Sequence, residues 1–217
     1  MIGPNTLWIS GGEDPQPTGT SELVSLVNGT LSTYEGPQLP IDVLGHCVVN
    51  ISKNGLEMFM MIGGFNNYIG DTNKTFIYGV TFGWIDGPDL NIPRRVHACG
   101  ILNVNDTRYV VVTGGASKQA EQSVEILDLN NIEQGWVSGP YLPKPLFAHS
   151  MVSTENSLVI IGGIESSGDG DKTSDEFYEM TYSNVGFHFM KMEQKLKSAR
   201  ANMVAMLVPD DITNCEF

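Results

Sequence analysis

Three histidines occupy matching places in the chain and are its clearest candidates for metal chemistry. His46 and His97 each precede a Gly-Gly pair by 17 residues, and His149 precedes one by 13. Neutral imidazoles that face a common axis could together bind a metal ion. No pattern of cysteine, tyrosine or carboxylate residues accompanies them, so we favour a structural role, in which each histidine bonds a neighbouring part of the fold.

An acidic segment, GDGDKTSDE at 168–176, has some of the spacing of a calcium-binding loop. Counted from Asp169, however, the sixth position holds Ser174 instead of glycine and the twelfth holds Met180 instead of glutamate. We interpret the segment as a solvated acidic loop. The chain also has no nucleophile elbow and no His-Glu-x-x-His motif, so we expect no metal, no cofactor and no enzymatic activity.

The three cysteines, Cys47, Cys99 and Cys215, are too few for a disulfide framework and lack metal-ligand spacing. Cys47 follows its histidine by one residue and Cys99 follows its histidine by two. Because side chains alternate along a strand, the two cysteines should point to opposite faces. We therefore expect no bridge between them.

The elements that would position these residues are revealed by a repeat. A Gly-Gly pair preceded by an apolar run occurs four times, and the second glycines are 52, 51 and 48 residues apart. Such a near-constant period indicates an array of similar structural units. Trp84 and Trp136 keep the same register, and each is followed by Gly-Pro. The four pairs are Gly11-Gly12, Gly63-Gly64, Gly114-Gly115 and Gly162-Gly163.

One unit reads as four short strands. In the third unit we expect strands at 96–103, 109–113 and 123–129, and a short outer strand that begins at Trp136. No helical period is present. We therefore predict an all-β chain of four four-stranded antiparallel sheets, from repeats at about 7–40, 41–91, 92–143 and 144–197.

These units resemble the kelch repeat. The closest match runs from Tyr109 to Gly115, continues through Val124–Ile126 and Trp136, and ends at Pro143-Lys144. The second unit matches through its glycine pair, Tyr78, Trp84 and Pro93-Arg94-Arg95. The resemblance covers almost the whole chain and implies a β-propeller, in which the sheets stack as blades around an axis.

Two units depart from the motif. The first has Thr33-Tyr34 where tryptophan is expected, and the fourth has Phe187 or Phe189 there and lacks the Gly-Pro. Arg200 takes the place of the fourth unit's basic residue. Aromatic bulk is kept, so packing between blades is still expected.

The number of blades in the intact ring stays open. The first unit begins with the second strand of a blade, and residues 198–208 read as a closing strand that could complete it in a four-bladed ring. The same count fits part of a larger propeller, for which the resemblance implies six blades, and we favour this second interpretation. Residues 209–217 read as a C-terminal tail.

Composition limits the partners. The formal net charge is −13 and the sequence pI is about 4.5, which disfavours nucleic acid and anionic membranes. No apolar run approaches the roughly 18 residues needed to span a bilayer, so membrane insertion is not expected. The chain as written shows no signal peptide, which predicts a cytoplasmic protein if Met1 is the true start and permits a secreted one if the chain is truncated.

Four Asn-x-Ser/Thr sequons would carry glycans only in a secreted protein. They are at Asn28, Asn50, Asn73 and Asn105.

The resemblance implies a non-catalytic module for protein–protein interaction, acting as an adaptor or scaffold. Kelch propellers commonly bind ubiquitin-ligase substrates or actin, although no BTB-like or BACK-like helical region is present here. The alternative is a secreted or cell-surface glycosylated kelch protein. A remote alternative is a copper enzyme of the galactose oxidase kind, whose ligand set is not recognisable.

We expect the variable loops after the glycine pairs to bind the partner, because rigid sheets commonly present functional loops. These loops are 13–20, 65–74, 116–122 and 164–173. The candidate binding residues are Tyr68, Arg94, Arg95 and Lys118. For the two arginines, a salt bridge or packing position between blades is the alternative.

Overall fold

The computed structural model describes residues 6–167 and 170–208, and in them the chain is all-β, with one short 3-10 helix, η1 (Ile132–Gln134). Its main strands form four antiparallel sheets. The first sheet contains β1 (Thr6–Ser10), β2 (Ser21–Val27) and β3 (Thr30–Glu35), and the second contains β4 (Cys47–Asn50), β5 (Met58–Ile62), β8 (Thr75–Gly79) and β9 (Gly83–Asp86). The third sheet contains β10 (Ala98–Val104), β11 (Thr107–Thr113), β12 (Val124–Asp128) and β13 (Val137–Ser138). The fourth sheet contains β15 (Ser150–Ser153), β16 (Leu158–Ile161), β19 (Glu176–Ser183) and β20 (Gly186–Lys195).

Two smaller sheets form within the connections between the main strands. One joins β6 (Phe65–Asn66) to β7 (Gly70–Asp71), and the other joins β14 (Leu146–Phe147), β17 (Ile164–Ser167) and β18 (Gly170–Thr173). No helix in the described part of the chain is long and apolar enough to cross a membrane.

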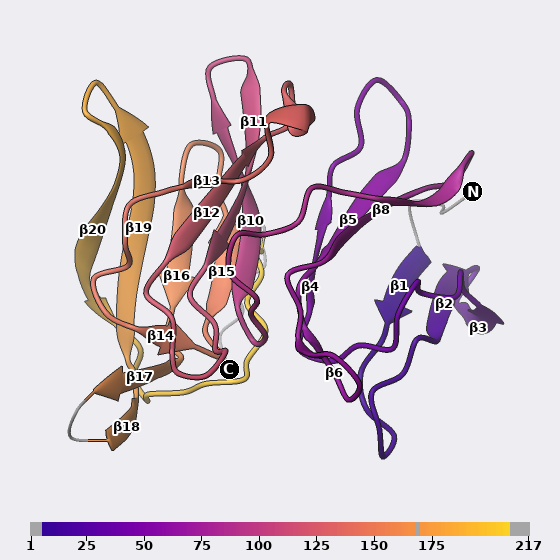
Figure 1. The fold of residues 1–217 in the computed structure, drawn as a ribbon, viewed down its shortest axis with the longest axis horizontal. Helices are drawn as coiled ribbons and strands as arrows, with labels where there is room; N and C mark the ends of the chain where they lie inside the picture. The colour runs from indigo at the N-terminus through magenta and orange to yellow at the C-terminus, as the bar shows by residue number, and fades with distance from the viewer. Residues whose placement is uncertain (1–5, 168–169, 209–217) are drawn as a thin grey trace.

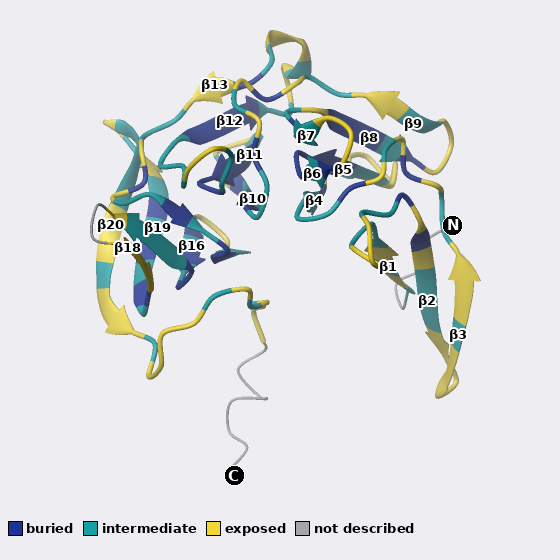
Figure 2. Ribbon diagram, turned by 60° about the horizontal axis from the view of Figure 1, so that its bottom comes forward, coloured by how far each residue is buried: buried dark blue, intermediate teal, exposed yellow. Residues whose placement is uncertain are grey.

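The four main sheets stand side by side in an arc (Figures 1 and 2). The strands β4, β10 and β15 lie on the inner side of the arc, and β3, β9, β13 and β20 lie on its outer rim. The arc is open between the first sheet and the C-terminal segment (Figure 2).

Apolar cores fill the spaces between adjacent sheets. Met60 and Ile62 face the third sheet, whereas Met61, between them in β5, faces the first. In β11, Val110 packs toward the second sheet and Val111 toward the fourth. The two middle sheets are therefore buried on both faces, which explains why their central strands are continuous apolar runs rather than alternating ones.

Aromatic side chains join neighbouring sheets. Trp8 of β1 lies against Phe59, Tyr78 and Trp84 of the second sheet, with ring centroids 5.3, 5.7 and 5.8 Å away. Trp136 is buried and donates its indole N–H to the carbonyl oxygen of Pro88 at 2.7 Å. The two repeat tryptophans therefore lie between sheets, as aromatic bulk at these positions predicts.

Each predicted repeat contributes one main sheet, so the prediction of an all-β chain of antiparallel sheets is confirmed. The first sheet has three strands instead of four. The expected closing strand, 198–208, forms no strand within the described chain. Its Asn202 N–H instead bonds the carbonyl oxygen of Ala148, beside the fourth sheet. The predicted tail, 209–217, lies outside the described residues.

A belt of backbone hydrogen bonds explains where this segment lies. The N–H of Val96 donates to the carbonyl oxygen of Gly45, that of Ala148 to Val96, and that of Asn202 to Ala148, at 2.8–2.9 Å. All four residues have positive φ, between 47° and 62°. Asn202 thus repeats the backbone geometry that begins the second, third and fourth units, next to the last sheet rather than beside β1.

Candidate functional site

The glycine pairs organise one end of the molecule, which we call the glycine-pair end. The first glycine of each pair has φ of 56–59° and the second 95–108°, conformations that side chains with a Cβ rarely adopt. Each second glycine donates its N–H to a carbonyl in the segment that follows its own unit, at 2.8–2.9 Å, and a Cβ on each first glycine would collide with that same oxygen. The four acceptors are Val43, Arg94, Leu146 and Arg200.

The repeated histidines pack against these glycines instead of forming a metal site. The Nε2 of His46 is 3.1 Å from Ser10 Oγ, and the Nε2 of His149 is 2.8 Å from Thr113 Oγ1, both in the preceding unit. Burial lowers the pKa of His46 to about 4 and that of His149 to about 3, so both are neutral at physiological pH. Among the described residues, no group of three or more His, Cys, Asp or Glu side chains could hold a metal ion; Asp169 lies outside them.

Arg94, a predicted binding residue, is fully buried and cannot contact a partner directly. Its guanidinium donates to Glu125 Oε1 at 2.8 Å, to the carbonyl of Gly114 at 2.7 Å and to Ser123. Asn91 donates to the other oxygen of Glu125 through its backbone and side chain. Sequence position alone did not show that this arginine points between the second and third sheets. Arg94 therefore has the alternative role, a buried salt bridge between two sheets.

The other candidates lie on the surface of the glycine-pair end. Arg95 forms an ion pair with Asp71, and its guanidinium carbon lies 5.1 Å from the ring centroid of Phe65. Lys118 is exposed in the connection between β11 and β12. Tyr68, in the turn between β6 and β7, is 90% exposed. Tyr68 thus lies in the small β6–β7 sheet, and Arg95 contacts the same sheet through Asp71 and Phe65. Lys118 lies further along the chain, between β11 and β12.

A cavity of about 310 Å³ lies beside Tyr68 and joins connections of the first two sheets. Asn66, which is buried, holds the turn: its amide donates to the carbonyl of Asp42 at 2.7 Å, and its oxygen accepts from the backbone N–H of Tyr68 at 2.8 Å. Sequence reasoning missed Asn66, although an asparagine before a turn is a known turn-forming signal. The lining residues are Gln16, Pro17, Asp42, Asn66, Asn67 and Tyr68.

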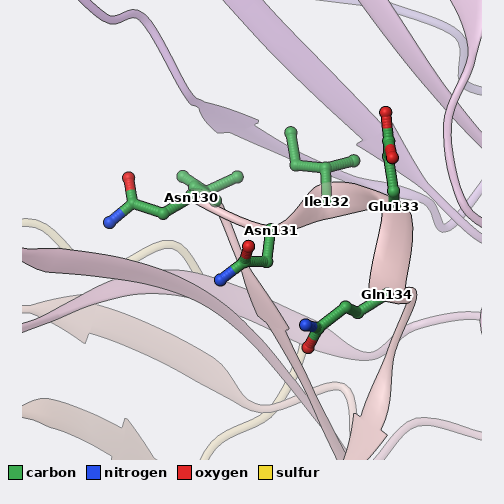
Figure 3. A pocket seen from close by; sticks show the side chains of 6 residues that line it. Asn130, Asn131, Ile132, Glu133 and Gln134 are labelled. Carbon is green, nitrogen blue, oxygen red and sulfur yellow. The ribbon is translucent and has the colours of Figure 1, made fainter.

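The opposite end, which we call the hairpin end, also has a hollow, of about 450 Å³ and formed by residues 129–134 (Figure 3). Its side chains come from one connection, and those labelled in Figure 3 point in different directions rather than toward a common centre. Asn130 already accepts a hydrogen bond from Lys53, and Asn131 donates to Asp128. Both side chains already have partners within the protein, so the hollow is a weaker candidate.

The expectation that Cys47 and Cys99 stay unbridged is wrong. They form a disulfide with Cα atoms 6.1 Å apart, between β4 and β10. The alternation argument correctly placed the two side chains on opposite faces of their own sheets. Because the second and third sheets stack face to face, however, opposite faces of equivalent strands are the ones that meet. The bridge joins two adjacent sheets.

Comparison with known proteins shows the fold but no family. No family model matches the chain, and no curated protein matches it. A solved structure described as "Structure of YjhT" matches with a TM-score of 0.72 at 14% identity. The match covers 92% of this chain and 65% of that one, so this chain spans less than two thirds of the neighbour. At this identity the likeness is one of fold alone.

Proposed function

We propose that the chain is a non-catalytic kelch-type propeller module that binds another protein through its glycine-pair end. The observation that carries this is Tyr68, 90% exposed on a turn fixed by buried Asn66 and adjoining a cavity shared by two sheets. A rigidly presented tyrosine provides a large contact area at little entropic cost, and tyrosine is enriched among residues that dominate binding energy.

The propeller part of this proposal rests on the exposed apolar face of the first sheet. Leu7 and Leu31 project from the face of the first sheet that is turned away from the second, and both are more than 60% exposed. Within the described residues β1 pairs only with β2, whereas the equivalent strand β5 has the inner strand β4 beside it. We propose that further sheets of the same kind complete a ring larger than four.

Substitution of Tyr68 tests the binding proposal. The immobilised chain and its Tyr68→Ala variant are each incubated with extract of the cells that produce the protein, with purified actin as a named probe, and captured proteins are quantified by mass spectrometry. We expect the variant to capture roughly tenfold less of the main partner, or less still, as for loss of an anchoring aromatic.

The matched control is Tyr34→Ala. Tyr34 is 59% exposed but lies on the rim strand β3, away from the cavity, so capture should be unchanged. Equal capture by wild type and Tyr68→Ala would contradict the proposed binding end.

A second candidate, an extracellular kelch protein, is favoured by the Cys47–Cys99 disulfide. Such bridges form and persist in oxidising compartments and are rare in the cytosol. Peptide mapping of the native protein without reductant tests this: we expect a linked peptide pair containing Cys47 and Cys99, and two freely alkylated thiols would contradict it. The oxidase alternative gains no support from the described side chains, and we do not propose it.

A further inference from the structure

The four sequons are divided between the two ends of the molecule. Antiparallel strands place successive turns at alternate ends of a sheet, so the glycine pairs identify one end and the hairpin turns the other. Asn28 lies in the β2–β3 turn, Asn50 at the end of β4 and Asn105 in the β10–β11 turn, all at the hairpin end. Asn73 lies just before β8, at the glycine-pair end.

The three sequons at the hairpin end present their asparagines to solvent. Asn28, Asn50 and Asn105 are all exposed, and their amide nitrogens form no hydrogen bond within the described part of the chain. Asn28 and Asn105 have φ of 50° and 53°, which places them at the tips of tight turns. Asn50 uses only its side-chain oxygen, which accepts the N–H of Ser52 at 2.8 Å. The acceptor nitrogen is therefore free at each site.

Asn73 differs from the other three at its amide nitrogen. Its amide nitrogen donates to the carbonyl oxygen of Leu90 at 3.0 Å, and the side chain is partly buried. The hydroxyl of Thr75, only 1% exposed, donates to the carbonyl oxygen of Pro88 at 2.8 Å. A glycan needs an acceptor nitrogen that points into solvent, and this nitrogen points into the protein.

The disulfide supplies an independent observation about the compartment. N-glycosylation requires the secretory pathway, and the Cys47–Cys99 bridge indicates the same oxidising environment. Neither observation depends on the other, since the bridge lies between β4 and β10 and the sequons lie at turns and strand ends.

We propose that Asn28, Asn50 and Asn105 carry N-linked glycans, that Asn73 carries none, and that the hairpin end is thereby covered while the glycine-pair end stays open for a partner. At each site the asparagine Nδ2 forms an N-glycosidic bond to C1 of an oligosaccharide supplied by a polyprenyl-diphosphate donor. The glycosyl–phosphate bond breaks, and polyprenyl diphosphate leaves as the amide proton is released. This inference rests on the extracellular candidate.

Site mapping on the native protein tests the proposal. The protein, isolated from the cells that produce it, is treated with peptide N-glycosidase in H₂¹⁸O, which converts each glycosylated asparagine to ¹⁸O-labelled aspartate, and its peptides are sequenced by mass spectrometry. We expect label at positions 28, 50 and 105 and none at 73. Absence of label from any of the three, or label at 73, would overturn the proposal.

Two measurements distinguish the glycan assignment from the extracellular candidate and from the proposed binding end. A native protein with the Cys47–Cys99 bridge but no glycan overturns the glycan assignment and leaves the extracellular candidate standing. Free thiols together with unmodified sequons overturn both. Partner capture by the unglycosylated chain and its Tyr68→Ala variant reports on the binding end alone, whatever the glycan map shows.

Discussion

The buried histidines make the stability of the fold depend on pH. Burial removes the water that would stabilise a charged imidazole, and it lowers the pKa of His46 to about 4 and those of His97 and His149 to about 3. In the unfolded chain each titrates near 6.5. Below pH 6.5 the unfolded chain therefore binds protons that the folded protein does not, and the free energy of unfolding falls. Above pH 6.5 the imidazoles are neutral in both states and contribute nothing.

Acidification should therefore destabilise the protein, and removing one histidine should reduce the effect. At pH 5 each buried histidine costs about 2 kcal/mol of the free energy of unfolding. Between pH 7.5 and 5, we expect the free energy of unfolding of His149→Gln to fall by about 2 kcal/mol less than that of wild type. Urea unfolding at both pH values measures the difference. The comparison stops at pH 5 because carboxylates, with ordinary pKa values near 4, are still mostly ionised there. An equal loss in both proteins would contradict the assignment.

At the scale of the strand, local pattern was a reliable guide. The apolar runs before each glycine pair form β1, β5, β11 and β16, because a short apolar run bounded by glycines is typical of a strand. Each main sheet likewise takes its strands from one of the four repeats. These features depend on residues within one unit, which is why the sequence shows them.

Contacts between elements were less predictable. The disulfide was missed, and the sequence left open whether Arg94 binds a partner or packs between blades, since both depend on which face of one sheet meets which face of the next. Asn66 was missed for a related reason: its role becomes visible only when the connection holding Asp42 lies beside it. Periodicity within a strand says which side chains share a face, but stacking decides what that face touches.

At the scale of the whole molecule, no element within residues 6–167 and 170–208 covers the outer apolar face of the first sheet (Figure 2). The first sheet buries Trp8 against its neighbour but exposes Leu7 and Leu31 on its other face, at 67% and 68%. The central sheets of the arc cover both of their faces, and a sheet of this kind gains much of its stability from such stacking. If further sheets complete the ring, these two leucines lie in a core of the intact protein.

Substitutions on this face distinguish a completed ring from an open arc. In the full native polypeptide, Leu7→Thr and Leu31→Thr introduce a β-branched residue suited to a strand but remove apolar contact, so each should lower the free energy of unfolding by about 1–2 kcal/mol if another sheet covers them. Leu56→Thr, 51% exposed in the β4–β5 turn, is the control and should change it by less than about 0.5 kcal/mol. Denaturant unfolding of the three variants measures the difference. Effects at Leu7 and Leu31 as small as that at Leu56 would mean that this face meets water in the native protein, and that the arc stands without further blades.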